Sequence, residues 1–449
     1  MSDLYLLLGA VIGIASIAAL LVISYLKFEW AIFIVAFSSW MPYIFYENSI
    51  ESIIEEQVGI GSYLRIITVV AMGVVGLIKF IKYFPRHKGR VPLHFSLLGI
   101  FLIIASVSII YSIDQQITMI RAATFIAFFA FLLGLYAWLK EEEQFYRAIN
   151  SLYYVILAFI VLSLIGLAVM PERVWWWNIS NRLIGIWGHP NTNGIFCLTA
   201  YPVLLWKFNH TNRYGKILIV FLFIIVLLMH IMTGSRTSLF ASLVGICAWF
   251  IAQKQGVKIV LSVLTISLFA FILIQINPES FEREKSKEIT DVTGRDKFWD
   301  SAEILITEKP LTGYGYAVEG KVFSDPRFYV PGYALWSGSN RTSIHNGYLS
   351  IALGVGIIGI LIWIVLLLLP FIRGLSTSVS YYKAFAYSIM AMMLLENFAE
   401  SALDSANSIG AIFFWVGWIV IGRIYEIEKL EAYEETDEIE EDIESSYAA

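Results

Sequence analysis

The sequence predicts an all-α polytopic membrane protein with about 12 or 13 transmembrane helices and one large outward-facing loop. Hydrophobic residues make up 58% of the 449 residues and charged residues only 15%, whereas about a quarter of the residues in a soluble domain are charged. Apolar runs of about 18 to 25 residues recur along the chain, which is the length that an α-helix needs to cross the hydrocarbon core of a bilayer.

Thirteen apolar runs mark the expected spans. They lie at residues 4–26, 29–46, 63–83, 93–113, 117–139, 148–170, 189–207, 214–232, 237–253, 257–276, 344–373, 380–398 and 406–423. The first run has no basic segment before it and no small-residue cleavage site, so we expect a retained helix and not a signal peptide.

The spans and the loops between them divide the chain into five parts. These are N-terminal transmembrane helices at 1–170, transmembrane helices with outward loops at 171–276, a large extracytoplasmic loop with an amphipathic helix at 277–343, C-terminal transmembrane helices at 344–423 and an acidic cytoplasmic tail at 424–449.

Lysine and arginine residues predict the orientation of the spans, because short cytoplasmic loops are enriched in them. They follow the third, seventh, ninth, eleventh and last spans, so we expect that side to be cytoplasmic. The loops 47–61, 171–189 and 233–237 and the large loop then face outward. The basic residues are Lys79, Lys82, Arg86, Lys88, Arg90, Lys207, Arg213, Lys216, Lys254, Lys258, Arg373 and Arg423.

The tail from Ile424 carries eleven acidic residues and one lysine, a net charge of −10, while the whole chain has −5. We expect this tail to be solvated and without regular structure, with binding of a cytosolic partner as the alternative. Cys197 and Cys247 each lie inside an apolar span, so neither is expected in a disulfide or a zinc site. No residue cluster has metal-ligand spacing, and we expect no metal, no cofactor and no nucleic-acid partner.

A polar run at 188–194 leads directly into an apolar span. The tryptophans at 175–177 before it are typical of the aromatic belt at a membrane interface. The polar run needs another explanation: His189, Asn191 and Asn193 are candidates to cap the next helix or to line a pocket.

The turn at 232–238 places Arg236 among small residues. An arginine at the end of a span often extends to the lipid headgroups. That role requires neither Ser235 and Gly234 before it nor the threonine and serine after it. Small neighbours let a ligand approach the backbone closely, so an anion site at Arg236 with Ser235 in support is the second interpretation.

The large loop contains a predicted amphipathic helix near 297–309, which starts with a Thr-x-x-Asp pattern and stops at Pro310. We expect residues 311–316 to form a flexible turn. Arg295 precedes this helix, where backbone N–H groups also face outward, and suits a phosphate. A surface ion pair is the alternative for this arginine. The apolar stripe is Phe298, Trp299, Ala302, Leu305 and Ile306.

The large loop ends at the mouth of the next span, where His345 lies between Ser343 and Asn346. A histidine at the edge of a span is usually interfacial. Its polar neighbours at the exit of the loop make His345 our candidate catalytic residue, with Arg341 and Asn346 in support. The three glycines at 354, 356 and 359 are typical of close helix packing.

The junction of the last two spans carries several polar residues. Charged residues at membrane depth default to a functional hypothesis, which makes Glu400 a further pocket candidate. A simple outward loop explains Asp404.

Four blocks in order resemble the O-antigen ligase/O-antigen polymerase superfamily. They are RLIG at 182–185 with GHPN at 188–191, TGSRT at 233–237, GRDKFW at 294–299 with PLTGYG at 310–315, and HNGYL at 345–349 with Gly354 and Gly359. The resemblance covers residues 182–359, and the first six spans match only as generic membrane helices.

The resemblance implies a metal-independent, inverting glycosyltransferase of the GT-C type in the bacterial inner membrane. Such an enzyme takes a glycan from an undecaprenyl-pyrophosphate carrier at the outer face. His345 would take a proton from the acceptor hydroxyl. Arg236 and Arg295, with Arg182 in a lesser role, would hold the pyrophosphate, whose charge grows as the glycosidic bond breaks.

Polymerases and ligases share these motifs. We favour a polymerase that joins lipid-linked repeat units of an O-antigen or exopolysaccharide, with a chain-length regulator as a candidate partner. A ligase would transfer the glycan to a lipid A-core acceptor. A transporter of the same lipid-linked glycans is a third hypothesis, but transporters of this size usually show internal repeats, which the sequence lacks.

Overall fold

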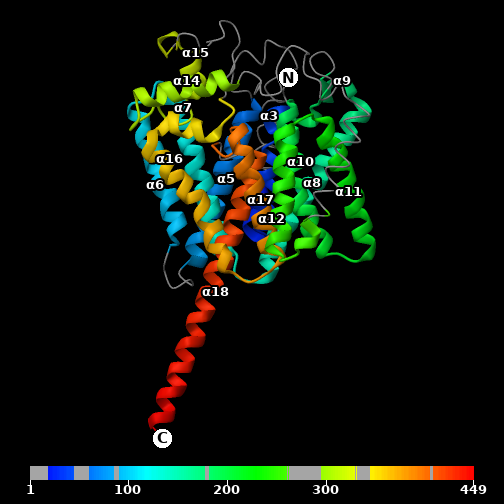
Figure 1. Cartoon of the computed structure of the whole chain (residues 1–449), viewed down its shortest axis with the longest axis vertical. Coiled ribbons are helices and arrows are strands. Elements are labelled where there is room, and N and C mark those ends of the chain that lie inside the picture. The colour runs from blue at the N-terminus through cyan, green and yellow to red at the C-terminus, as the bar shows by residue number, and fades with distance from the viewer. Residues whose placement is uncertain are drawn as a thin grey trace, which may run out of the picture.

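The computed structural model describes residues 19–44, 60–84, 91–176, 182–259, 261, 295–328, 330, 344–404 and 408–448. Within these ranges the only sheet is a short antiparallel pair, β1 (Trp175–Trp176) with β2 (Arg182–Leu183). The helices stand side by side in one bundle (Figure 1). We call the end with α9 (Pro171–Val174) the loop end, and the end from which α18 (Ile409–Ala448) projects the tail end.

Seven helices of the described ranges are long and apolar enough to cross a membrane, so the predicted all-α, multi-pass fold is confirmed. Their elements are α5 (Ile60–Tyr83), α6 (Leu93–Val107) with η2 (Ser108–Ile110), α7 (Gln115–Trp138), α8 (Glu142–Val169), α11 (Arg213–Met232), α16 (Gly347–Arg373) with η6 (Gly374–Ser376), and α18.

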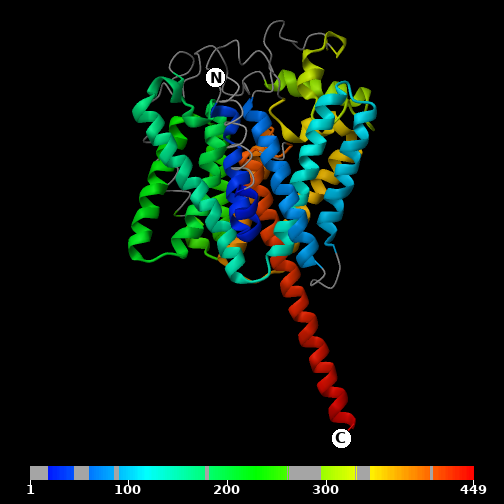
Figure 2. The ribbon, with the colours of Figure 1, turned by 180° about the vertical axis from the view of Figure 1, so that it is seen from behind.

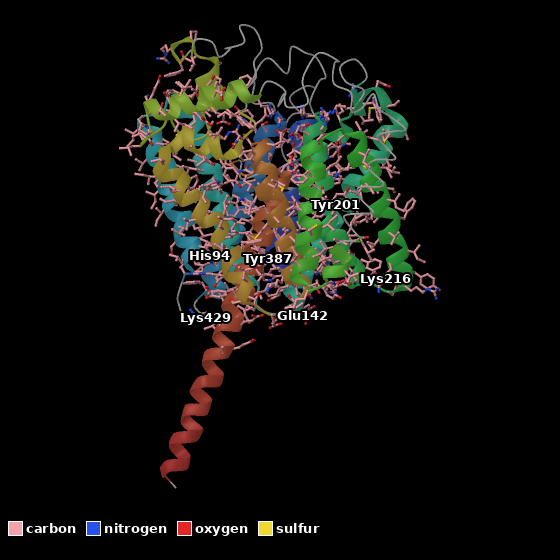
Figure 3. The ribbon with its side chains drawn as sticks, in the orientation of Figure 1. His94, Glu142, Tyr201, Lys216, Tyr387 and Lys429 are labelled. Atoms are coloured by element: carbon pink, nitrogen blue, oxygen red, sulfur yellow. The ribbon has the colours of Figure 1, made fainter. Side chains whose placement is uncertain are left out.

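Further predicted spans coincide with shorter or more polar helices. These are α2 (Glu29–Ser38), which follows helical residues 19–26 and precedes α3 (Met41–Ile44), α10 (Pro190–Asn209), α12 (Arg236–Ala252) and α17 (Tyr381–Ala399). Most of the predicted spans 4–26 and 257–276 lies outside the described residues. Charged side chains such as Glu142, Lys216 and Lys429 lie near the tail end (Figure 3).

The acidic tail is helical, so the prediction that it lacks regular structure is wrong. The helix α18 runs without interruption to Ala448 and projects from the bundle (Figures 1 and 2). Its first part lies inside the bundle, so the nucleation cost that limits isolated helices is met there. Glutamate, which is the commonest residue in the tail, is a good helix former that lets the helix continue.

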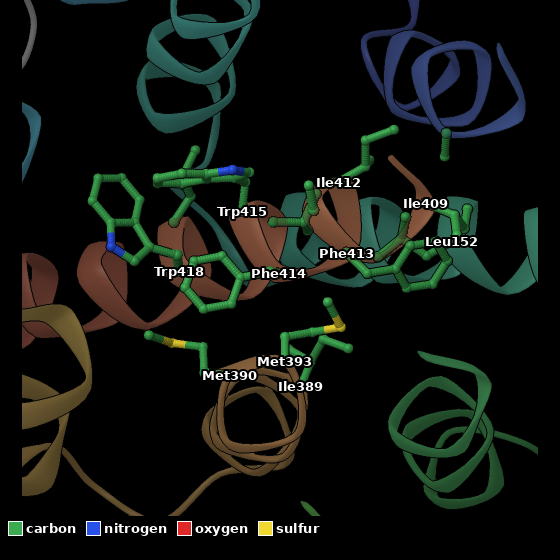
Figure 4. Packing of buried hydrophobic residues seen from close by; sticks show 14 of the residues in the cluster. Leu152, Ile389, Met390, Met393, Ile409, Ile412, Phe413, Phe414, Trp415 and Trp418 are labelled. Carbon is green, nitrogen blue, oxygen red and sulfur yellow. The ribbon is translucent and has the colours of Figure 1, made fainter. Parts of the chain in front are cut away.

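The first part of α18 also forms the centre of the core. Trp415 and Trp418 are fully buried, and Phe414 lies on the side of α18 that faces Met390 and Met393 of α17 (Figure 4). The indole N–H of Trp418 donates to the carbonyl of Leu366 on α16, at 2.8 Å. These contacts fix α16, α17 and α18 against one another.

At the loop end, α16 is broken by Gly356, whose φ of +73° lies in the left-handed region. The break exposes the carbonyls of Leu353 and Gly354, which accept hydrogen bonds from the N–H groups of Tyr314 and Gly315, each at 2.9 Å. The prediction of a flexible turn at 311–316 is therefore wrong, because the backbone of α16 holds this segment in place.

The predicted amphipathic helix is confirmed as α14 (Arg295–Glu308), followed by α15 (Glu319–Ser324) and η5 (Pro326–Phe328). Its apolar stripe faces a second, smaller core at the loop end. The buried members of that core are Phe298, Ala302, Leu305, Tyr314, Val318, Val322, Phe323, Ile344 and Leu353. The start of α14 thus has a fixed position above α16.

Candidate functional site

One carboxylate connects three of the predicted motifs at the loop end. Glu400 caps the C-terminus of α17, and its side chain is 13% exposed. Its Oε1 accepts hydrogen bonds from Arg295 Nη2 and from Asn191 Nδ2, both at 2.6 Å, and its Oε2 lies 2.8 Å from His345 Nδ1. Predicted as a supporting residue, Glu400 is the centre of the site.

Arg295 lies at the start of α14. Besides the ion pair with Glu400, its Nη1 donates to the carbonyl of Ala399 at 2.5 Å. The indole of Trp299, one turn along α14, donates to the carbonyl of Ile344 at 3.0 Å. The helix α14 therefore holds Arg295 close to the backbone that precedes His345.

His345 lies just before Asn346, the N-cap of α16, and has a φ of +53°. A non-glycine residue in this left-handed region carries about 1–3 kcal/mol of strain, and such residues cluster at functional sites. Asn346 compensates locally, because its Oδ1 accepts hydrogen bonds from the N–H groups of Tyr348 and Leu349 at 3.0 and 3.1 Å. Asn346 is therefore a helix cap that fixes the backbone beside the imidazole.

Arg182 on β2 extends this network. Its Nη2 donates to Asn191 Oδ1 at 2.9 Å, and its Nε donates to the carbonyl of Thr233 at 2.5 Å. Thr233 belongs to the turn that precedes Arg236. One arginine thus connects the first and second predicted loops.

His189 caps α10 through Nδ1, which accepts from the N–H of Asn191 at 3.2 Å. Burial lowers the pKa of His189 to about 4, with Glu400 opposing and Arg182 adding to the decrease. His189 is therefore neutral near pH 7. Asn193 is fully buried, and its Nδ2 donates to the carbonyl of Leu183 at 3.4 Å, which makes it a support of the loop.

In the turn before α12, Ser235 is buried and Arg236 is exposed. Ser235 is buried, and its hydroxyl lies 2.7 Å from that of Ser238, which in turn donates to Glu396 Oε1 at 3.0 Å. Arg236 is the first residue of α12, and its side chain is exposed at the loop end. Arg341, the remaining predicted residue, lies outside the described residues.

The electrostatics of the cluster favour an ionised carboxylate. Burial by itself raises the pKa of Glu400. The hydrogen bond from His345 and the charges of His345 and Arg295 outweigh burial and lower this pKa to about 2. We call these six residues, Arg182, His189, Asn191, Arg295, His345 and Glu400, the Glu400 cluster.

Three charged residues at the loop end, Asp404, Arg65 and Arg121, were not among the predicted site residues. Asp404 is more than a loop residue, because its Oδ2 accepts from the Ser350 hydroxyl at 2.9 Å and its carbonyl from the Tyr316 hydroxyl at 2.8 Å. Arg65 and Arg121 were passed over entirely. Each is a lone arginine near the start of an apolar span, a signal that would have marked them as candidates.

The fold and this polar site define a multi-pass membrane protein with a charged cluster at one end of its bundle. Residues 221–364 match the family model described as O-antigen ligase, and this match supports the O-antigen ligase/polymerase superfamily that the motifs resemble. Members of this family are glycan-transferring enzymes. No curated protein matches the chain. The matched segment contains Arg236, Arg295 and His345, whereas Glu400 lies beyond it.

Proposed function

We propose that the chain is a glycosyltransferase that polymerises undecaprenyl-pyrophosphate-linked repeat units of a surface polysaccharide. The observation that carries the proposal is the Glu400 carboxylate, which bridges His345 and Arg295, a candidate base and a candidate phosphate ligand. The loop end would face outward from the bacterial inner membrane. Lys207 in the last turn of α10 and Lys216 in the first turn of α11 lie toward the opposite side, which supports a cytoplasmic tail end.

His345 would act as the general base. Its Nδ1 is engaged by Glu400, so the opposite ring nitrogen, Nε2, would take the proton of the acceptor hydroxyl. The hydroxyl oxygen would bond to the anomeric carbon of the donor while the bond from that carbon to the pyrophosphate oxygen breaks, and the electron pair would leave with the pyrophosphate. Displacement from the opposite face inverts the anomeric centre. Ionised Glu400 would stabilise the imidazolium that forms.

Arginine side chains would stabilise the departing pyrophosphate. A guanidinium carries five N–H donors in a planar fork. The described hydrogen bonds of Arg295 use one donor on each of Nη1 and Nη2, so the group retains donors for phosphate oxygens while it stays paired with Glu400. Arg182 and Arg236, near the same turn, would add positive charge where the leaving group becomes more negative.

A ligase is the second candidate, because the matched family model is described as O-antigen ligase. The chemistry at His345 would be the same, and only the acceptor would differ. In that case the glycan would pass to a lipid A-core sugar.

The glycans of cells that lack this chain distinguish these functions. A polymerase predicts single repeat units on the lipid carrier and no long chains, with rescue by the wild-type chain and no rescue by His345→Ala. Long chains that remain on the carrier without transfer to a surface acceptor would identify a ligase. Unchanged carrier and surface pools would contradict both.

A further inference from the structure

Two arginines of the N-terminal helices lie at the loop end, outside the Glu400 cluster. Arg65 is in the second turn of α5, and Arg121 is in the second turn of α7. Both helices begin at the loop end, where a Cβ on Gly61 would collide with Met41 of α3, and where the N–H of Ile113, just before α7, donates to the carbonyl of Tyr314.

The helices α5 and α7 pack with their backbones in direct contact. A Cβ at Gly73 would collide with the carbonyl of Ala127, and one at Gly134 would collide with the backbone of Gly76. Helices packed this closely hold their backbones at a fixed separation. The backbone positions of Arg65 and Arg121 relative to one another are therefore set by this packing.

Among the described residues, Arg65 has no neighbour that neutralises its charge. The described groups whose charge acts on its guanidinium are Tyr43 and Arg121, and Arg121 carries the same charge. Arg65 Nε is buried and has no hydrogen-bond partner among the described residues. Two like charges in a partly buried setting repel strongly, and an anion between them would remove that cost.

Intermediate residues connect both arginines with the surroundings of the Glu400 cluster. On one side, the hydroxyl of Tyr43 bonds to Thr192, the residue after Asn191. On the other side, the charge of Arg121 opposes the burial that raises the pKa values of Tyr316 and Glu319. The carboxyl group of Glu319 lies near Arg121, which leaves Arg65 as the guanidinium with no described carboxylate partner. The pair thus borders the site from the N-terminal half of the chain.

We propose, resting on the polymerase function above, that Arg65 and Arg121 form a second phosphate-binding site, which holds the pyrophosphate of the lipid-linked acceptor. A polymerase binds two pyrophosphate-linked glycans at once, a donor and an acceptor. Arg182 and Arg295 serve the donor in this scheme. Guanidinium groups suit a second pyrophosphate because they bind phosphate oxygens in a bidentate manner.

The test uses the full-length protein in nanodiscs with a lipid-linked donor and two acceptors of the same sugar sequence. One acceptor carries the polyprenyl pyrophosphate, and the other is a phosphate-free alkyl glycoside. We expect Arg65→Gln and Arg121→Gln to lower kcat/KM for the pyrophosphate-linked acceptor by roughly tenfold or more and to leave the alkyl glycoside nearly unchanged. Arg147→Gln near the tail end, which removes an exposed ion pair with Glu143, is the matched control.

An equal loss with both acceptors would overturn the inference, since it would mean a role in folding or in donor binding. A loss that appears only in nanodiscs with anionic phospholipid would also overturn it, because the site would then hold a lipid headgroup. Wild-type protein that transfers to the alkyl glycoside but not to the pyrophosphate-linked acceptor would contradict a second pyrophosphate site. Wild-type protein inactive on both acceptors would overturn the proposed function, and this inference with it.

Discussion

Glu400 Oε2 lies 2.8 Å from His345 Nδ1, although 55 residues separate the two in sequence. The same carboxylate holds Arg295 through its other oxygen. An anionic partner on one ring nitrogen fixes the tautomer of an imidazole and stabilises its protonated form. In the proposed reaction, the Glu400 carboxylate thus connects His345, the base, to Arg295, which binds the pyrophosphate.

Glu400→Gln is expected to lower kcat by about 10²- to 10⁴-fold, because the neutral amide cannot stabilise an imidazolium at His345. The measurement is the rate of glycan transfer by purified protein. Glu143→Gln, an exposed glutamate near the tail end, serves as the control. A Glu400→Gln protein with nearly wild-type kcat would show that the carboxylate only supports the local structure.

The stability of the protein at different pH values should reflect the low pKa of Glu400. Burial opposes ionisation, but His345 and Arg295 lower the folded-state pKa from 4.5 to about 2. The ionised carboxylate therefore stabilises the fold above the unfolded-state pKa, and this contribution is lost as pH falls from about 4.5 toward 2. The Tm difference between wild type and Glu400→Gln in detergent should therefore decrease as the pH is lowered from about 4.5 toward 2. A Tm difference that is already lost above about pH 4.5 would contradict the low pKa.

Arg295→Ala should abolish glycan extension, because it removes a phosphate ligand and leaves the Glu400 carboxylate without its guanidinium. Arg295→Lys keeps the charge but cannot donate to Ala399 and Glu400 in the same planar geometry, so we expect only partial recovery. Arg236→Ala should also abolish extension while the protein remains in the membrane. Chain lengths on a gel report the result, and full-length chains in either alanine variant would remove that arginine from the phosphate site.

Gly356→Ala should destabilise the protein by about 1–3 kcal/mol, because alanine resists a φ of +73°. The added Cβ would also collide with the carbonyl oxygen of Leu311. The matched control is Gly99→Ala on α6, where a Cβ would meet no atom within 4 Å. The measurement is the Tm of both variants in detergent. Equal Tm values would show that the break in α16 is not required by the segment that docks there.

Much of the fold follows from the sequence, because spans are defined by long apolar runs and α14 by its apolar spacing and Pro310. The break in α16 could not be predicted. Glycines at 354, 356 and 359 are typical of helix packing, and only the docking of residues 310–315 shows why Gly356 leaves the helical conformation. The helical tail was missed because its charge suggested disorder.

The site was predicted by its parts and not by its arrangement. Arg295 and His345 were identified by their motifs, but the central position of Glu400 depends on how α14, α16 and α17 meet in space. No local pattern encodes that meeting. Asn193 and Asn346 were predicted to line the pocket, yet the side chain of each binds the backbone. An amide side chain can bind either a ligand or the backbone, so the sequence does not distinguish these roles.

The most direct test of the central claim is glycan transfer by purified His345→Ala, compared with wild type and with His210→Ala. His210 follows α10 near the tail end, where its ring packs on Trp206. We predict long glycan chains from wild type and His210→Ala, and none from His345→Ala at equal protein amounts and similar Tm. Long chains made by His345→Ala at a rate near that of the wild type would contradict the role of His345 as the base.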